Sequence, residues 1–586
     1  MGTVSKKHSY IFFLFLKGLR NVIALVMICF SFTTLAQDSN ELGTEVVTIV
    51  KPYSPTISDA FKVKETPVLT DTDTIQKKEV TYEIFSVPVA STFTPSKGKA
   101  TMVDKAKPPQ LFDSYATLGF GSYTSVLAEL FSSFEISRTD NAGIFIRHNG
   151  AHGDIENVVL KSNYLDTELS GNYTSRQKDM AYKIEAGVQH QIFNWYGLNP
   201  IFDAATDETI NTIDPQQTYL GVNIGGNISF NESLFERLTA KIYYLGDAYS
   251  SSEINLNVQP KFTFPLSEFT LQMQGELDYL TGTFDRNYVS EVELPYSFLN
   301  AGVTPSLIYV NNDLTLSLGA TALVSLDTEK SNTQFFIYPQ INVSYRLLEE
   351  VAIVYGGVEG GLHQNSYQKF KDDNPFVSPT LIIMPTSKLY TAFGGLKGKL
   401  NNQISYNLRG SYGKEENSAL FQLNPYKGMN SEFKGYEYGN SFRIVYDDLR
   451  ILNLFGELKI AVSDYFTLGA NANFFSYSTE IEPEAWNLPQ LTAAVFSNFN
   501  ITKKVYGGVS LFFVGERKGL FTVNLPQVIT LNSYLDANIH LGFRFNDRLS
   551  FFGKGSNLLG DNYQKWQNFP VQGIQGLLGA TYKFDW

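Results

Sequence analysis

The chain has 586 residues, a mean hydropathy of -0.12 and a formal net charge of -12. Behind the N-terminal region no run approaches the roughly 20 apolar residues of a transmembrane helix, which excludes a helical membrane protein. The acidic balance offers no basic face, which excludes a nucleic-acid-binding protein. The single cysteine, Cys29, lies in the N-terminal region, so a processed chain has neither disulfides nor cysteine metal sites.

Residues 1–36 have the three parts of a signal peptide. Positive charges come first, on Lys6, Lys7, Lys17 and Arg20. Val22–Phe32 then supplies a short apolar stretch, and small residues ending at Ala36 predict cleavage before Gln37. A retained membrane anchor is the alternative, which the short apolar stretch disfavours. Lipidation at Cys29 is disfavoured because Ile28 stands where a lipoprotein signal carries a small residue.

Residues 37–112 are rich in Pro, Thr, Lys and Asp and lack long periodic apolar stretches. This composition predicts an extended or partly disordered segment in the periplasm or in the lumen of a barrel. Two short apolar islands interrupt it, Val46–Val50 and Tyr82–Val89. The second island is followed by lysines and would thread the lumen as a rudimentary plug. A solvated periplasmic linker is the alternative.

From residue 113 to the C-terminus, apolar and polar residues alternate in stretches on the order of 10 residues. In residues 252–264 one face carries Ile254, Leu256, Val258, Phe262 and Phe264, and the other carries Glu253, Asn255, Asn257, Gln259, Lys261 and Thr263. Such alternation gives a sheet one apolar and one polar face. Long strands, a polar face rich in Gln, Asn and Thr, and aromatic residues near strand ends favour a membrane barrel over a soluble sandwich. The absence of a blade-length sequence repeat disfavours a β-propeller.

We therefore predict an all-β fold: a transmembrane antiparallel β-barrel of about 22 strands over residues 113–586, with an extended N-terminal periplasmic segment. Short links near residues 348–350, 463–464, 502–504 and 546–548 predict periplasmic turns. Longer polar segments near 195–214, 281–293, 362–387, 415–435, 478–488, 515–528 and 557–572 predict extracellular loops.

Two details of the strand assignment need a decision. The candidate strands number about 23, whereas an even number is usual. We assign Tyr436–Asp447 to an extracellular excursion, which leaves about 22 strands. Pro260, Pro305 and Pro339 fall inside predicted strands, where they indicate bulges or displaced strand limits.

The C-terminal stretch carries the most specific pattern. It runs Asn557-Leu558-Leu559-Gly560, then Tyr563, Trp566, Phe569-Pro570 and Gly573, and ends in Gly579-Ala580-Thr581-Tyr582-Lys583-Phe584. This pattern resembles the last two strands of TonB-dependent outer-membrane receptors, and the strand number extends the resemblance over the barrel. The alternating Tyr582, Phe584 and Trp586 look like the C-terminal signal that the barrel assembly machinery recognises. They also suit an interfacial aromatic girdle.

The resemblance stops before the barrel. Such receptors carry a folded plug domain there, and residues 37–112 are too few for one, so the resemblance implies a receptor-like barrel lacking the plug. One segment resembles a TonB box, which implies strand pairing with TonB: Glu45, Val46, Val47, Thr48, Ile49 and Val50. Binding of this segment in the barrel's own lumen, or to another periplasmic protein, is the alternative.

No catalytic constellation is apparent in the sequence, and we predict neither an enzyme nor a cofactor. His148 and His152 have no carboxylate close in sequence, so we interpret them as exposed polar residues. Three acidic clusters suit loop solvation or weak calcium binding: Asp203/Asp207/Glu208, Asp372/Asp373 and Asp447/Asp448. Trp195, Trp486 and Trp566 fall at loops, where packing is favoured over stacking on ligands.

Two functional hypotheses follow for the outer membrane of a Gram-negative cell. The first is transport or binding of a solute or polymer by a plugless TonB-receptor-like barrel. The second is a non-transporting subunit of a multi-protein outer-membrane complex, such as a partner of the barrel assembly or secretion machinery. The expected partners are outer-membrane lipid, the barrel assembly machinery during biogenesis, TonB or another periplasmic protein, and other outer-membrane proteins.

Overall fold

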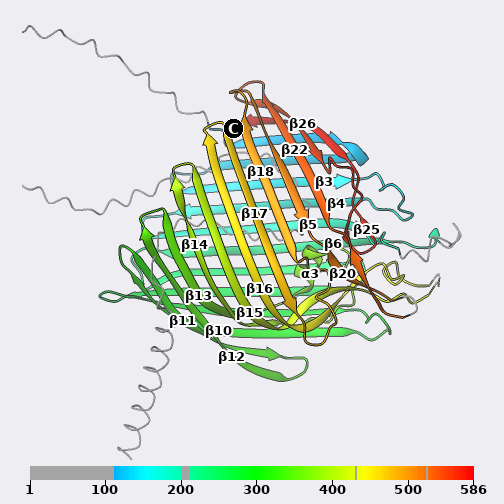
Figure 1. Ribbon diagram of the computed structural model, residues 1–586, viewed down its shortest axis with the longest axis horizontal. Helices are drawn as coiled ribbons and strands as arrows, with labels where there is room; N and C mark the ends of the chain where they lie inside the picture. Colours follow the sequence, from blue (N-terminus) through cyan, green and yellow to red (C-terminus); the bar gives the residue numbers. More distant parts are fainter. Residues whose placement is uncertain (1–110, 199–209, 429, 431, 523–524) are drawn as a thin grey trace, which may run out of the picture. The chain divides into compact units, whose positions relative to one another are not determined.

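The computed structural model describes residues 111–198, 210–428, 430, 432–522 and 525–586. Within them, 22 strands form one sheet, and a ladder between the first and last of these strands closes the sheet into a barrel (Figure 1). Every ladder in the barrel is antiparallel, which confirms the predicted fold class. The predicted signal peptide and the TonB-box-like residues 45–50 lie outside the described residues.

The first half of the barrel consists of β1 (Ser114–Gly121), β2 (Ser125–Glu135), β3 (Asp140–Ala151), β4 (Tyr164–Arg176), β5 (Met180–Asn194), β6 (Gln216–Phe230), β7 (Phe235–Asp247), β8 (Ser252–Pro265), β9 (Thr270–Phe284), β10 (Leu294–Val310) and β11 (Leu314–Asp327). The second half consists of β12 (Asn332–Leu348), β13 (Ala352–His363), β14 (Thr386–Asn401), β15 (Ile404–Leu423), β16 (Phe442–Ser463), β17 (Phe466–Ser478), β18 (Leu491–Asn500), β19 (Val505–Val514), β22 (Tyr534–Arg544), β23 (Leu549–Ser556) and β26 (Gln575–Phe584).

Smaller elements lie in the connections. They are the 3-10 turn η2 (Ser122–Thr124), the helix α3 (Tyr367–Asp373), and two hairpins, β20 (Arg517–Phe521) with β21 (Gln527–Leu531) and β24 (Gln564–Trp566) with β25 (Phe569–Pro570). Across the described ranges, no helix has the length and apolar character needed to cross a bilayer.

The two faces of the strands are divided as the alternation predicts. On β8, Ile254 and Phe262 point outward and are exposed, while Asn255 and Asn257 point inward. The inward pair donates side-chain hydrogen bonds to the carboxylate of Asp278 on β9, both at 3.0 Å. An apolar exterior around a polar interior is the pattern of a lipid-embedded barrel. The protein is therefore an outer-membrane barrel, as predicted.

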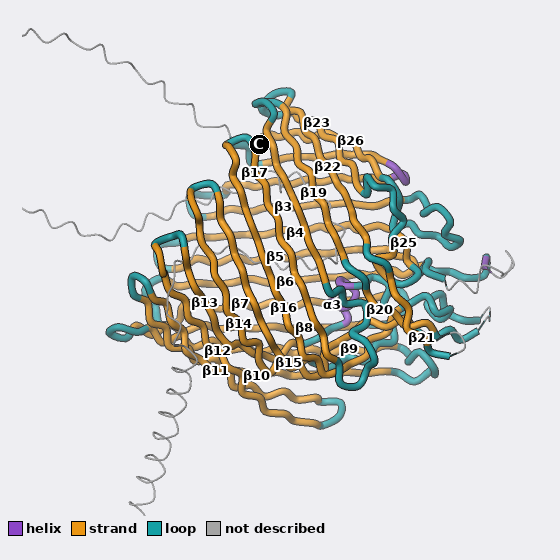
Figure 2. The backbone as a smooth tube through the Cα atoms, viewed as in Figure 1, coloured by secondary structure: helices purple, strands orange, loops and turns teal. Residues whose placement is uncertain are grey.

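The connections differ at the two rims, as Figure 2 shows. One rim has short turns, such as residues 349–351, 464–465, 501–504 and 545–548, which confirms the predicted short links. The other rim has the long loops, including 285–293, 364–385, 424–441, 479–490, 515–533 and 557–574. β1 starts and β26 ends at the short-turn rim, since Ser114 pairs with Phe584. By the usual asymmetry of these barrels, that rim is periplasmic.

Two details of the strand assignment were wrong. Phe442–Asp447 is not a loop excursion but the first part of β16, which continues through Asp447 and Asp448 to Ser463. The predicted loop at 415–435 starts instead after Leu423, because β15 extends to that residue. β15 and β16 continue to pair toward the extracellular side beyond the points where their other neighbours, β14 and β17, stop pairing with them. The β15–β16 ladder changes register between Glu415 and Ser418. The predicted number of about 22 strands is right. The assignment of Tyr436–Asp447 to a loop, by which we arrived at an even number, is wrong for Phe442–Asp447.

The three prolines mark neither bulges nor displaced strand limits. Pro260 stays opposite Leu238, and Pro339 stays opposite Ala320. The β8–β9 ladder keeps one register on both sides of Pro260 but omits the pairs beside it. The β10–β11 ladder likewise omits the pairs around Pro305. Each proline removes one N–H donor while its strand stays paired along the other edge, and at Pro339 the β12–β13 ladder ends.

Candidate functional site

The C-terminal aromatics that the sequence singles out lie at the closing seam. Tyr582 pairs with Ala116 of β1 and with Leu549 of β23, and its side chain points outward. Trp586 is exposed, and its ring packs against Phe584 and Phe134. These positions suit an interfacial girdle. Recognition by the assembly machinery stays a prediction.

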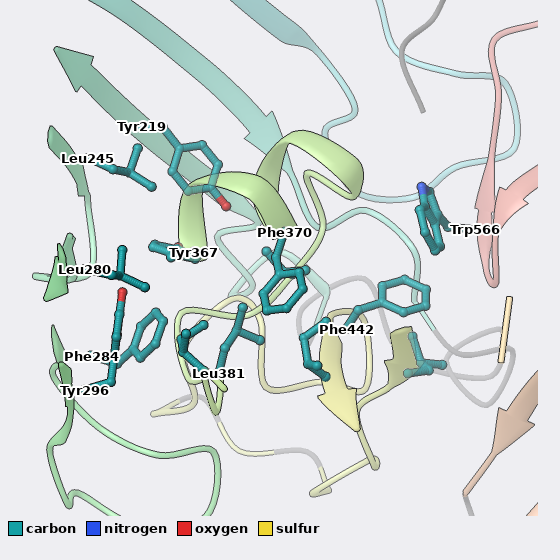
Figure 3. Packing of buried hydrophobic residues seen from close by; sticks show 14 of the residues in the cluster. Tyr219, Leu245, Leu280, Phe284, Tyr296, Tyr367, Phe370, Leu381, Phe442 and Trp566 are labelled. Atoms are coloured by element: carbon teal, nitrogen blue, oxygen red, sulfur yellow. The ribbon is translucent and has the colours of Figure 1, made fainter. Parts of the chain in front are cut away.

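The main candidate site is the extracellular mouth, which the loops fill. We call the segments 195–198, 285–293, 364–385, 432–441 and 557–574 the mouth cap. The segment 364–385 runs from the end of β13 into the mouth and back to β14, and it carries α3. Figure 3 shows α3 and its neighbours packed against side chains from the barrel wall. The buried core comprises Tyr219, Leu245, Leu280, Phe284, Tyr296, Phe298, Tyr367, Phe370, Val377, Leu381, Ile383, Leu423, Phe442, Ile444, Trp566 and Phe569.

Local sequence explains how α3 forms and which face it buries. Ser366 caps the helix, since its side chain accepts a hydrogen bond from the backbone N–H of Lys369. Tyr367 and Phe370 are three residues apart and lie on one buried face. The apolar Val377, Leu381 and Ile383 follow and enter the same core. Burying a large apolar side chain stabilises by about 1.5–3 kcal/mol, so this core fixes the segment in the mouth.

A barrel carboxylate anchors the start of α3. Glu253 of β8 is almost fully buried, and its two oxygens accept the backbone N–H groups of Tyr367 at 2.6 Å and Gln368 at 3.0 Å. The hydroxyl of Tyr296 donates to the same carboxylate at 2.8 Å. A helix N-terminus presents unpaired N–H donors and the positive end of its dipole. The carboxylate therefore satisfies donors that would otherwise be buried without partners.

A second carboxylate holds the other side of α3. The hydroxyl of Tyr367 donates to Asp247 of β7 at 2.8 Å, and Gln217 donates to the same oxygen at 3.1 Å. The buried Lys371 donates to the side-chain oxygen of Gln191 at 2.6 Å and pairs with Asp372 at 2.8 Å. The helix is thus tied by polar contacts to β5, β6, β7 and β8.

An ion cluster joins two further loops. Glu437 is buried in the segment 432–441, and its carboxylate contacts Arg286 at 3.2 Å and Lys427 at 2.5 Å. The carboxylate also accepts the backbone N–H of Lys434 at 2.8 Å. Lys427 in turn lies over the ring of Tyr288, which belongs to the same loop as Arg286. The cluster connects the loop after β9 to the loop after β15.

Aromatic contacts complete the mouth cap. The Trp195 indole donates to the carbonyl of Val377 at 3.3 Å. Tyr196 contacts Phe376 and Phe569 edge-on, and those two rings stack with centroids 3.9 Å apart. Segments after β5, β13 and β23 therefore meet in one packed cluster. The three loop tryptophans are buried, which confirms the packing interpretation of Trp195, Trp486 and Trp566.

Burial shifts the pKa values of several ionisable groups in the mouth cap. Burial lowers the pKa of Lys369 in α3, and the nearby Asp373 opposes this shift. Burial raises the pKa of Asp373, against the opposing effect of Lys369. Burial also lowers the pKa of Lys565 in β24 to about 8, and the neighbouring Arg517 guanidinium adds to that shift. These cations are held in a site that disfavours charge.

Below the cap, the barrel wall facing the lumen is polar. Arg409 pairs with Glu359 at 3.4 Å, and the hydroxyl of Tyr355 donates to Asn407 at 2.6 Å. His148 lies on this wall too, within 2.8 Å of the Thr167 hydroxyl, so it is not an exposed loop residue as predicted. Among the described residues, no group of three or more His, Cys, Asp or Glu side chains is arranged to hold a metal ion.

The acidic clusters also differ from prediction. Asp447 lies in β16, and its carboxylate accepts the backbone N–H groups of Glu480, Ile481 and Glu482. Asp447 therefore holds the start of the loop 479–490, whereas the prediction gave it the role of keeping a loop solvated. Asp372 and Asp373 belong to α3 inside the mouth. The Asp203 cluster lies outside the described residues.

Solved structures share this fold. The FrpB iron transporter from Neisseria meningitidis matches with a TM-score of 0.62 and 11% identity, over 80% of this chain and 81% of that chain. The siderophore receptor PirA from Acinetobacter baumannii matches with a TM-score of 0.61 and 12% identity, over 81% of each chain. The copper transporter OprC matches with a TM-score of 0.58 and 13% identity, over 82% of each chain.

No protein-family model and no curated protein matches the sequence. The similar structures are TonB-dependent receptors, so the likeness bears out the barrel part of the predicted resemblance. At such low identity the likeness shows the fold alone. The non-enzyme prediction stays a prediction.

Proposed function

We propose that the protein is a gated receptor or transport barrel of the outer membrane, which binds or moves a solute or polymer. The mouth cap is the gate. The observation that supports this most directly is the segment 364–385, which closes the mouth above a polar lumen wall. A wall of charged and amide side chains suits the passage of a hydrated solute. The similar structures of iron, siderophore and copper transporters support the same general role.

The way the segment is fixed favours a gate over a permanent wall. The chain enters it from β13 and leaves it into β14, and the side chains of Glu253 and Asp247 hold its helix. Its other backbone contact with the wall is short, a bridge in which Phe376 and Ser378 bond to Phe442 at the start of β16. A ligand that competes for these polar contacts, or a force on the segment, would release α3 without breaking any barrel ladder. The barrel would keep its full strand pairing while the mouth opens.

Conductance in a planar bilayer tests the gate. The purified wild-type protein is expected to conduct little, and a variant with residues 366–383 replaced by a short Gly-Ser linker is expected to conduct strongly. A matched control replaces the exposed tip 328–331, which is outside the cap, and should behave like wild type. Equal conductance of the wild type and the linker variant would refute the gate.

The N-terminal segment enters this proposal through Glu45–Val50. We propose that these residues pair with TonB, or with another periplasmic protein, and that residues 37–112 form a strap in the periplasm or the lumen instead of a folded plug. Deletion of residues 44–54 tests the pairing. If uptake or binding in cells is unchanged by the deletion, TonB coupling through this stretch is wrong.

The second candidate is a non-transporting subunit of an outer-membrane complex. The apolar core between the mouth cap and the barrel wall favours it, because opening the cap would expose seven buried side chains of the cap to water: Tyr367, Phe370, Val377, Leu381, Ile383, Trp566 and Phe569. Mild-detergent purification from native membranes distinguishes the two. Stoichiometric co-purification with other outer-membrane proteins, such as the assembly or secretion machinery, together with a wild-type barrel that never conducts, would favour the subunit.

A further inference from the structure

One stretch of the barrel wall has an open strand edge. The ladder between β12 and β13 begins at Gln340 opposite Glu359 and runs toward the periplasm. Continuing the same register outward would place Tyr338 opposite Gly361 and Phe336 opposite His363. In the described part of the chain, neither pair forms, and Asn332–Pro339 pair with β11 alone. The β12–β13 ladder therefore ends at Gln340, although the side chain of Tyr338 still lies close to Gly360.

A bulge explains why the two strands separate. The ladder between β13 and β14 changes register between Glu359 and Gly361, which bends β13 toward β14. β13 then leads directly into the segment 364–385 that fills the mouth. Two side-chain contacts fasten the base of the split: Gln340 donates to the carbonyl of Gly360 at 2.6 Å, and the Tyr338 and Ser387 hydroxyls lie 2.9 Å apart. Pro339 offers no N–H toward β13 at this point.

The open edge carries the two most exposed large apolar side chains of its strand. Phe335 and Ile337 are 78% and 81% exposed, whereas Leu408, outward on a closed part of the wall, is 54% exposed. Both side chains point outward beside the unpaired backbone. In Figure 1 the tip of the β11–β12 hairpin stands apart from the rest of the wall at the lower edge of the view.

The position of this edge makes its exposure costly. Outer-membrane strands cross the hydrocarbon in about 9–11 residues, and the aromatic Tyr345 lies near the periplasmic end of β12. Counting outward from Tyr345 places Phe335 and Ile337 at the extracellular boundary of the hydrocarbon. Water can satisfy the unpaired backbone groups that lie beyond this boundary, but it leaves the apolar side chains of Phe335 and Ile337 exposed. The edge therefore suits an occupant that supplies both backbone donors and acceptors and an apolar face.

An extended peptide supplies both, whereas water cannot cover the apolar side chains. Lipid tails have no donors or acceptors to offer the backbone. A second copy of this chain in the same membrane is related by rotation about the membrane normal, so the two β12 strands would cross at about twice the strand tilt, on the order of 70–90°. Strands crossing at that angle cannot form a ladder. A free segment of another protein has no such constraint and can add to the edge as a strand.

We propose that the edge Asn332–Pro339 of β12 is a docking site for an extended segment of a partner protein at the outer leaflet. The segment adds as a strand to the free edge, and its outward apolar side chains cover Phe335 and Ile337. The site lies on the outside of the wall and does not depend on whether the lumen transports anything.

Site-specific photo-crosslinking in native membranes tests the proposal. A photoreactive phenylalanine analogue is placed at Phe335 or at Ile337 in the full chain, and at Leu408 as the matched outward control. The expected result is that both edge positions link to one partner segment, at residues two apart, because alternate residues of a paired strand share a face. Leu408 should give lipid adducts only. Links to a second copy, to the chain's own N-terminal residues, or to lipid alone would overturn the proposal.

Hydrogen exchange gives a readout that does not require the partner's identity. The amides of Thr333, Phe335 and Ile337, which alternate with those bonded to β11 and face the open edge, should be protected in native membranes. They should lose at least tenfold in protection after purification in detergent, while the amides of β8 stay unchanged. The double variant F335S/I337S should lose this protection in native membranes, and L408S should keep it. Equal protection before and after purification, or none in native membranes, would overturn the docking site.

Discussion

The carboxylate of Glu253 in β8 accepts the backbone N–H of Tyr367 at 2.6 Å, across 114 residues of sequence. This contact joins the barrel wall to the first turn of the helix in the mouth. The same carboxylate also accepts hydrogen bonds from the hydroxyl of Tyr296 and the backbone N–H of Gln368, so it accepts three hydrogen bonds in all. Two of these three donors are backbone N–H groups of α3, so the contact holds the helix start itself.

We expect Glu253→Gln to loosen the mouth cap without unfolding the barrel. The amide has the same shape, but its NH2 group faces donors where the carboxylate had an acceptor. A buried donor left without a partner costs about 1–3 kcal/mol. The amides of Tyr367 and Gln368 should then exchange with deuterium about tenfold faster or more. Glu268→Gln, in an exposed periplasmic turn, is the control, and equal effects of the two changes would contradict the anchoring role.

Removing the Glu437 carboxylate should separate two loops of the mouth cap. In Glu437→Ala, Arg286 and Lys427 lose their buried partner, and breaking a buried ion pair costs on the order of 3 kcal/mol. Limited proteolysis of the intact protein should then cut within 285–293 or 424–441 at protease levels that leave wild type whole. Glu432→Ala changes an exposed charge of the same loop and should not alter the pattern. An unchanged digest for both variants would show that the cluster does not hold the loops.

The stability of the mouth cap should rise with pH above neutrality because of Lys565. Its pKa of about 8 in the folded cap lies below the ordinary value of 10.5, so the opened cap binds more protons between these two values. Stability increases with pH wherever the opened form binds more protons, and the window is therefore roughly pH 8 to 10.5. Below pH 8 the cost of the buried charge is fully present.

Hydrogen exchange of the α3 amides across that range measures the effect. After correction for the intrinsic pH dependence of exchange, protection should increase from pH 8 to 10 in wild type. Lys565→Met should reduce this increase and raise protection at pH 7, and Lys369, whose pKa burial also lowers, accounts for the part that remains. The exposed Lys518→Met, in the neighbouring hairpin, should leave the pH dependence intact. A wild-type profile that is flat over this window would show that Lys565 is not held in a charge-disfavouring site.

Phe584→Ala should reduce assembly more than a comparable change elsewhere on the lipid face. Phe584 pairs with Ser114 at the seam and belongs to the alternating aromatics Tyr582, Phe584 and Trp586. The amount of heat-modifiable, protease-resistant barrel in the outer membrane measures assembly. Phe551→Ala alters an exposed outward aromatic of β23 and is the control. If both substitutions reduce the yield equally, Phe584 acts only as a girdle residue.

Much of the barrel was predictable because lipid and water impose opposite demands on alternate residues. The period of two fixes which side chains of β8 and β9 face outward, and loop length fixes the rims. The β15–β16 extension was not predictable in this way. Beyond the membrane both of its faces are buried, one against α3 and the other against Trp486, so the polar and apolar faces no longer differ.

The mouth cap was the larger omission. The segment 362–387 was correctly placed in a loop, but its inward fold depends on contacts with Glu253 and Asp247, which are far away in sequence. A signal was present: Phe376, Val377 and Leu381-Ile382-Ile383-Met384 give this loop an apolar content that solvent-exposed loops rarely have. The open edge of β12 was not predictable either, because it results from a bulge in the neighbouring pair of strands.

The seam between β1 and β26 has a consequence for biogenesis. The hydroxyls of Thr117 and Thr581 lie 2.9 Å apart across it, although 464 residues separate them in the chain. No intermediate lacking β26 can satisfy the edges of β1 and β23, and an open edge is not tolerated in hydrocarbon. Release into the membrane must therefore wait until the last residues arrive. The barrel can therefore close only around a chain that has been made to its C-terminus. A truncated chain keeps two unpaired strand edges, on β1 and β23, and we expect a chaperone to bind it or a protease to degrade it.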